Sequence, residues 1–100
     1  MAYEVIVKKR FTNKIIQLLN HIEREWGKPV ADRFLKKLEK RISTLARQPY
    51  IGGPSEMKNV RSILIAKQNR LYYRIKGNQI EIITLFDTRM HPTKNRYKRK

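Results

Sequence analysis

Two helical runs separated by a very short break are the feature that most constrains this chain. Apolar residues recur at helical spacing from Ile15 to Trp26, and Thr12 or Asn13 ahead of them is a good N-cap. Gly27 ends this first run, and Pro29 suits the first turn of a second one. A break this short predicts that the two helices form an antiparallel hairpin.

The second helix combines an apolar stripe with a basic remainder. The stripe recurs at helical spacing until Pro49 ends the run, and consists of Val30, Phe34, Leu38, Ile42 and Leu45. Most of the surface that the stripe leaves exposed is basic: Arg33, Lys36, Lys37, Lys40, Arg41 and Arg47. Basic residues suit a solvated helix face, and they equally suit a surface that follows a phosphate backbone. The sequence leaves both interpretations open.

Strand patterns lie on either side of the helices. Residues 3–7 alternate as a short strand does, and the only substantial loop, residues 48–60, follows the second helix. Three strand-like runs complete the chain, at residues 61–67, 70–76 and 79–86. We therefore expect an α+β fold with an N-terminal strand, an antiparallel helical hairpin and a three-stranded antiparallel meander, with the helices packed on one face of the sheet.

The turn at Gly77 and Asn78 predicts how the last two strands pair. A two-residue turn at this point places Arg74 opposite Glu81, Tyr73 opposite Ile82 and Leu71 opposite Thr84. One face of the hairpin, which we expect beneath the helices, then holds Leu71, Tyr73, Ile75, Ile80, Ile82 and Phe86. The other face holds Arg70, Tyr72, Arg74, Glu81, Ile83, Leu85 and Asp87.

The second face of this hairpin has two interpretations. Arg74 opposite Glu81 can be a cross-strand ion pair that contributes about 0.2–1 kcal/mol. Alternatively, Arg70, Tyr72 and Arg74 place two guanidinium groups around one aromatic ring, an arrangement that can hold a phosphate and stack a base.

Net charge indicates the kind of partner. The chain has 24 Lys and Arg residues against 8 Asp and Glu residues, which gives a formal net charge of +16. Such a charge favours a polyanion as partner, with nucleic acid first because phosphate contacts release counterions, and an acidic protein second. The length of 100 residues suits a single domain over residues 1–100.

Composition also excludes several kinds of chemistry. The chain has no cysteine, so it cannot form a disulfide, a thiolate nucleophile or a zinc ribbon. His21 and His91 lie far apart and lack metal-ligand spacing, so we expect no metal and no cofactor. No run approaches the roughly 18 apolar residues of a membrane span, and the N-terminus lacks a long apolar segment. We therefore expect a cytoplasmic protein without a membrane partner.

The exit from the last strand carries residue types suited to phosphodiester chemistry. Asp87, Arg89, His91 and Tyr97 offer a carboxylate, a charge clamp, a group that titrates near neutral pH and a phenol. The basic tail, residues 94–100, is typical of a disordered segment. Its cations are further candidates for nucleic-acid contacts, in particular Lys94 and Arg96.

Taken together, the chain resembles the RelE/ParE superfamily of toxins from bacterial type II toxin–antitoxin systems. The match rests on the order and spacing of degenerate motifs along the whole chain. These are the loop with Pro49 and Gly52-Gly53 leading to Val60-Arg61, then Tyr73-Arg74-Ile75, then the apolar strand Ile80–Phe86 closing on Asp87-Thr88-Arg89 and Pro92. The resemblance implies a small growth inhibitor that forms a hetero-oligomer with a short, acidic, partly disordered antitoxin.

Within this family, the resemblance also suggests site residues. Arg61 and Arg89 match positions where RelE-like nucleases keep phosphate-binding arginines, and Lys58 and His91 lie near them in sequence. For a nuclease, His91 or Tyr97 is the candidate acid, and Asp87 or a lysine is the candidate base. The chain departs from the RelE-like pattern at Asp87-Thr88 and in the late position of Tyr97.

The target divides the family. RelE-like members cut mRNA in the ribosomal A site, whereas ParE-like members inhibit DNA gyrase without hydrolysis. The charge of +16 favours ribosome-dependent, metal-independent mRNA cleavage slightly over gyrase inhibition. A non-toxic nucleic-acid-binding module is the alternative from a different class.

Overall fold

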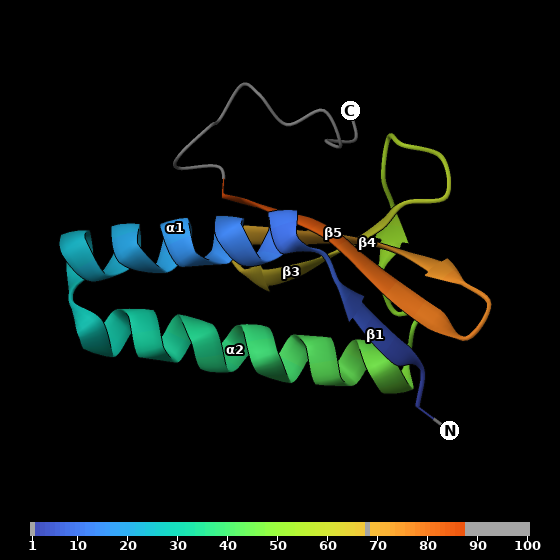
Figure 1. Ribbon diagram of the computed structural model, residues 1–100, viewed down its shortest axis with the longest axis horizontal. Helices are drawn as coiled ribbons and strands as arrows, with labels where there is room; N and C mark the ends of the chain where they lie inside the picture. The colour runs from blue at the N-terminus through green and yellow to red at the C-terminus, as the bar shows by residue number, and fades with distance from the viewer. Residues whose placement is uncertain (1, 68, 88–100) are drawn as a thin grey trace.

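The chain folds into a helical hairpin packed on a five-stranded mixed sheet (Figure 1). The computed structural model describes residues 2–67 and 69–87. The elements, in chain order, are β1 (Glu4–Val7), α1 (Lys9–Trp26), α2 (Lys28–Arg47), β2 (Gly53–Pro54), β3 (Arg61–Ala66), β4 (Asn69–Lys76) and β5 (Gln79–Asp87). The sheet order is β1-β5-β4-β3-β2, with β1 parallel to β5 and the other neighbours antiparallel. The expected α+β architecture is confirmed, and the short strand β2 is an addition to it.

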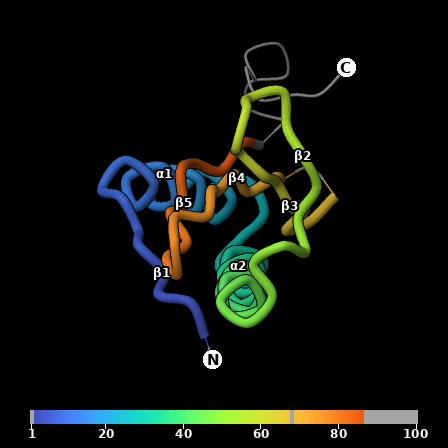
Figure 2. Tube along the Cα trace, turned by 90° about the vertical axis from the view of Figure 1, so that its right-hand side faces the viewer, coloured from blue at the N-terminus to red at the C-terminus, as the bar shows by residue number. Residues whose placement is uncertain are grey.

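A single glycine joins the two helices. Gly27 has a φ of 94°, which a residue with a Cβ rarely adopts. Its N–H donates to the carbonyl oxygen of Glu23 at 2.8 Å, and its own carbonyl accepts the N–H of Ala31 at 3.3 Å. One residue therefore ends α1 and begins α2, and the expected antiparallel hairpin is confirmed. Figure 2 shows α2 end-on, with β2 and β3 on the side of the molecule away from α1.

Both ends of α1 differ from the expectation. The helix begins at Lys9, so Thr12 is not its N-cap but lies in its first turn, where its Oγ1 donates to the carbonyl of Lys8 at 3.4 Å. The earlier start carries Phe11 into the core, where only 4% of it is exposed. At the other end, Trp26 is 48% exposed and meets the ring of His21 edge-on, so it does not belong to the buried stripe.

The main core lies between the hairpin and one face of the sheet. Phe34, Leu38 and Leu45 of α2 pack in one cluster with the sheet residues Tyr73 and Ile82. The same cluster also takes in Phe11, Ile15, Leu18 and Ile22 of α1. The predicted stripe of the second helix is thus the face that packs on the sheet.

Pairing of β4 with β5 follows the predicted register only near the turn. Arg74 pairs with Glu81 and Tyr73 with Ile82, but a β-bulge then shifts the register, so that Tyr72 pairs with Thr84. Ile83 is the extra residue, and beyond it the faces of β5 are exchanged. The predicted faces of two residues are therefore wrong: Leu85 packs in the main core, and Phe86 packs on the opposite face with Val60 and Tyr72.

Strand β1 is held at the edge of the sheet from three sides. The N–H of Tyr3 donates to the carbonyl of Ala46 at 2.7 Å, and the N–H of Glu4 donates to the carbonyl of Asn78 at 3.0 Å. The amide of Gln79 also donates to the Glu4 carboxylate at 2.7 Å. The first strand, the end of α2 and the β4–β5 turn therefore lie together, which fixes the helices over the sheet.

Candidate functional site: a basic hollow at the sheet edge

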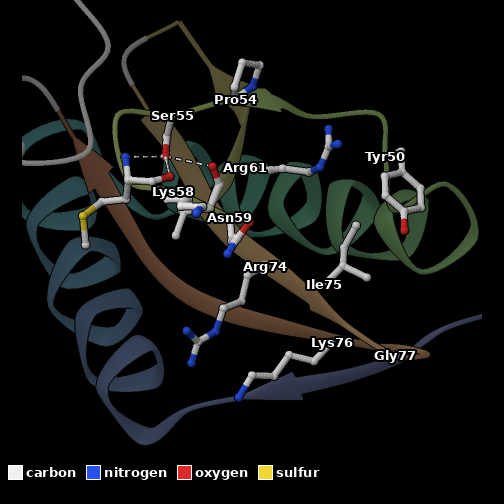
Figure 3. A pocket seen from close by; sticks show the side chains of 12 residues that line it. Tyr50, Pro54, Ser55, Lys58, Asn59, Arg61, Arg74, Ile75, Lys76 and Gly77 are labelled. Carbon is white, nitrogen blue, oxygen red and sulfur yellow. Dashed lines mark hydrogen bonds between the residues drawn. The ribbon is translucent and has the colours of Figure 1, made fainter.

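A hollow of about 910 Å³ opens where the loop before β3 faces the end of β4 (Figure 3). We call it the basic hollow, because four cations line it: Lys58, Arg61, Arg74 and Lys76. Tyr50, Ile75 and Val60 give the wall an apolar part. Pairing of β3 with β4 begins at Arg61 and Tyr73, so no described strand covers the β3 side of residues 74–76. The hollow therefore combines open strand edge, positive charge and an exposed aromatic ring.

A buried tyrosine fixes the loop that forms one wall. The hydroxyl of Tyr73 donates to the carbonyl of Pro49 at 2.8 Å and accepts the N–H of Gly52 at 3.0 Å. Burial raises the pKa of Tyr73, while the Gly52 N–H and the charge of Arg61 act in the lowering direction. A Cβ on Gly52 would overlap the Tyr73 hydroxyl and lie 2.8 Å from the carbonyl oxygen of Ser62. Position 52 therefore needs glycine because of close packing.

Arg61 is engaged inside this wall. Its Nη1 donates to the carbonyl of Gly52 at 2.7 Å, and its guanidinium lies 5.0 Å from the centre of the Tyr50 ring. A cation over an aromatic face is attracted to the ring, and the contact directs the side chain along the loop. Arg61 therefore lines the basic hollow, while part of its hydrogen-bonding capacity is used by the loop.

Arg74 makes the predicted cross-strand ion pair. Its Nη2 lies 2.7 Å from Glu81 Oε1 and its Nε donates to the same oxygen at 2.9 Å. Burial acts to raise the pKa of Glu81, but the hydrogen bond and charge of Arg74, with Lys8 and Lys76, outweigh it and lower the pKa. The ion-pair interpretation is confirmed, and the positive charge of Arg74 in the hollow is largely balanced by Glu81.

The predicted phosphate-and-base face on β4 is not an open surface. Tyr72 is fully buried with Val60 and Phe86, so the expectation of an exposed ring that stacks a base is wrong for this structure. The bulge at Ile83 places Phe86 on the face of Tyr72, and Val60 from the loop before β3 packs against the same ring. Arg70 is half-buried and its Nη1 donates to Ser62 Oγ at 3.0 Å. Arg70 and Arg74 therefore do not flank an accessible ring.

The remaining predicted site residues lie at or beyond the end of the described chain. Asp87 is the last residue of β5, and its backbone pairs with Asn69. Five of the predicted residues lie outside the described residues: Arg89, His91, Lys94, Arg96 and Tyr97.

Two residues that line the hollow, Tyr50 and Lys76, were not predicted as site residues from the sequence. Tyr50 is 63% exposed beside Arg61, and Lys76 ends β4 at the rim. An aromatic residue in a loop rich in proline and glycine was the available signal for Tyr50. Lys76 has no such signal, because it sits in an ordinary polar position next to a turn.

The described part of the chain lacks two further features. Over residues 2–67 and 69–87, no helix has the length and apolar character needed to cross a membrane. The same residues contain no group of three or more His, Asp or Glu side chains placed to hold a metal ion.

Solved structures share this fold at low sequence identity. A chromosomal ParDE toxin–antitoxin system from P. aeruginosa gives a chain with a TM-score of 0.76 at 17% identity, covering 86% of this chain and 96% of that one. A YoeB/ParE toxin from Agrobacterium tumefaciens gives 0.61 at 18% identity, with 84% and 97% covered. The RelBE2 toxin–antitoxin complex from Mycobacterium tuberculosis gives 0.61 at 20% identity, with 87% and 99% covered. Among curated protein sequences, none matches this chain.

The strand, helical hairpin and meander around this hollow define the chain as a protein of the RelE/ParE toxin fold. The family model described as the ParE toxin of the type II toxin–antitoxin system parDE matches residues 5–92. The chain therefore belongs to the ParE family of type II toxins, and the resemblance seen in the sequence is confirmed.

Proposed function

We propose that this chain arrests growth by ParE-like inhibition of DNA gyrase, without cleaving RNA, and that an acidic antitoxin neutralises it in a hetero-oligomer. The main support for gyrase inhibition is that the side chains predicted to contact phosphate and base are already bound or buried within the fold. Arg61 is bound to Gly52, Arg74 is paired with Glu81 and the Tyr72 ring is buried. The match of the ParE toxin model to residues 5–92 also supports it.

Gyrase inhibition is thus preferred to mRNA cleavage, which reverses the preference drawn from the net charge alone. A charge of +16 attracts any polyanion, but a nuclease also needs donors held free and aimed at the reacting phosphate. In the described part of the chain, the arginines expected to supply those donors have internal partners. The net charge therefore still attracts a polyanion. The described arginines, however, do not form the set of free donors that cleavage requires.

Ribosome-dependent mRNA cleavage is the second candidate, and the basic hollow favours it. Lys58 and Lys76 line the hollow and make no ion pair with another described residue, so both ammonium groups can meet a phosphate. In this candidate, Arg61 turns from Gly52 toward the phosphate, and Arg89 with His91, Tyr97 and Asp87 supplies the chemistry that the sequence suggests.

Inducible expression of the chain alone, followed by two separate readouts, distinguishes the candidates. We expect growth arrest with loss of negative supercoiling in a reporter plasmid and intact mRNA, and inhibition of purified gyrase by the purified chain. Cleaved mRNA with normal supercoiling would establish the second candidate instead. Normal growth at a verified level of folded protein would favour a non-toxic nucleic-acid-binding module.

Two variants sharpen this test. The double substitution Lys58→Ala/Lys76→Ala removes the free cations of the hollow, and Arg89→Ala removes the arginine at the strand exit. Gyrase inhibition through another surface predicts that the Lys58→Ala/Lys76→Ala protein stays toxic. Loss of toxicity in both folded variants, together with loss of mRNA cleavage, would support the nuclease.

A further inference from the structure

A second cavity lies at the far end of β3 from the basic hollow. It has a volume of about 320 Å³ and is formed by the end of α1, the start of α2 and the residues around the β3–β4 turn. We call it the hairpin-end cleft. Arg61 begins β3 at the hollow and Ala66 ends it at the cleft, so about 16 Å of strand separates the two. A partner in the cleft would therefore leave the hollow accessible.

The cleft has an apolar floor. Ile22 and Phe34 are almost completely buried beneath it, and Val30 and Ala66 are half-buried at its sides. A volume of this size accepts a bulky aliphatic or aromatic side chain, and filling it would remove apolar surface from water on both partners.

Cations surround this floor. Arg33 and Lys37 lie one helical turn apart on α2, and Lys67 follows β3. All three are exposed, and among the described residues none of them forms an ion pair. The groove on the other flank of α2, toward α1, is instead lined by Glu23 and Asp32. Arg33 and Lys37 therefore make the flank of α2 that borders the cleft positive, whereas acidic residues line the groove on its other flank.

We propose that the hairpin-end cleft docks an acidic segment of the antitoxin, which inserts one bulky apolar side chain between carboxylates that meet Arg33, Lys37 and Lys67. This inference rests on the proposed function, because the antitoxin is the acidic partner named there. The cleft favours a peptide over a nucleic acid, because Phe34, the only aromatic ring among its described lining residues, is almost completely buried and offers little surface on which a base could stack. Charge attracts the segment, and burial of the anchor prolongs its residence.

Binding of a labelled synthetic peptide to the full chain tests the chemistry of the cleft. The peptide contains one leucine flanked by three glutamates that are spaced one helical turn apart. Fluorescence anisotropy measures its affinity for the chain. We expect Arg33→Glu/Lys37→Glu to weaken binding by about tenfold or more, since two exposed ion pairs are lost and two repulsions appear. Replacing the leucine of the peptide by alanine should weaken binding by about the same factor.

The matched control is Lys36→Glu/Lys40→Glu, which makes the same change of net charge on exposed residues of the same helix. This control should weaken binding far less. An equal effect of both charge reversals would reduce the interaction to general attraction and overturn the proposal. Indifference to the leucine would overturn it as well, because the cleft would then hold no anchor. A single-stranded oligonucleotide that depends on Arg33 and Lys37 more strongly than the peptide does would assign the surface to nucleic acid.

Competition identifies the antitoxin as the occupant and separates this inference from the proposed function. The peptide should be displaced by the acidic protein whose co-expression restores growth. Failure of that protein to displace the peptide, with growth inhibition and neutralisation intact, would overturn the docking inference alone. Absence of growth inhibition would overturn the proposed function, and the docking of the antitoxin with it, whatever the peptide binds.

Discussion

Tyr73 shows how one side chain can connect a core to a functional wall. Its ring packs in the main core, while its hydroxyl reaches Pro49 and Gly52 in the loop that shapes the basic hollow. The partners lie 24 and 21 residues away in sequence, so no local pattern could reveal the contact. Arg61 adds a second tie to the same loop through the Gly52 carbonyl.

Substitution of Tyr73 by phenylalanine should destabilise the protein by about 1–3 kcal/mol. The change keeps the packed ring but leaves a buried N–H and a buried carbonyl without their partner. Urea unfolding measures the cost, with Tyr50→Phe as the control, because Tyr50 is exposed and should change stability by less than about 0.5 kcal/mol. Equal stability of the two variants would show that the hydroxyl bonds contribute nothing net.

Glu81 should make the stability of the fold depend on acid. Its pKa is lowered in the folded protein from the ordinary value of 4.5, so its stabilising effect is present above that pH and is lost as the pH falls through the folded pKa. The free energy of unfolding should therefore decline below about pH 4.5 more steeply in the parent chain than in Glu81→Gln. The control is Glu39→Gln, an exposed carboxylate, which should leave the decline unchanged; identical curves for parent and Glu81→Gln would refute the linkage.

At the scale of elements, glycine, proline and asparagine residues predicted the turns of the fold correctly. Gly27 and Pro29 predicted the helical hairpin, and Gly77 with Asn78 predicted the last turn and the pairs nearest to it. The bulge at Ile83 left no signal, because an apolar residue there suits either face of the strand. As a result, the core beneath the helices was predicted correctly near the turn, whereas the faces of Leu85 and Phe86 were predicted wrongly.

Substitution of Leu38 by alanine tests the packing of α2 on the sheet. Leu38 is 3% exposed within the main core, so the variant should lose about 2–5 kcal/mol from the transfer of the side chain and the cavity it leaves. Thermal and urea unfolding measure this loss. The control is Leu64→Ala on β3, where the side chain is 44% exposed, and a loss in Leu38→Ala as small as in that control would mean that the wrong helix face was assigned to the core.

At the scale of the whole molecule, charge is abundant but unevenly arranged. The formal net charge is +16, yet the described ion pairs and hydrogen bonds occupy Arg61, Arg70 and Arg74 on the sheet. Each of the two cavities is nevertheless bordered by cations that make no ion pair with another described residue, Lys58 and Lys76 at the hollow and Arg33 and Lys37 at the cleft. Composition predicted a basic protein, and only the fold could show where its charge is directed.

Association with the antitoxin should depend strongly on salt. Raising ionic strength from about 0.01 M to 0.15 M shortens the screening length from roughly 30 Å to 8 Å. We expect the association rate constant to fall by about tenfold or more, with a smaller change in dissociation, because steering acts before contact. Stopped-flow mixing measures both rates, and a neutral osmolyte at matched osmolality is the control. A salt-independent association rate would contradict electrostatic steering.

The parallel pairing of β1 with β5 links the order of synthesis to the onset of toxicity. The first strand to leave the ribosome finds its neighbour only when Gln79–Asp87, the last strand of the sheet, has been made. Until then β1 lacks its sheet partner and the helices have no Ile80, Ile82 or Leu85 to cover. Because such distant contacts form late in folding, a nascent chain cannot complete this core before residues 79–87 have been made. An antitoxin that is already present can therefore bind each new toxin as soon as this core is complete.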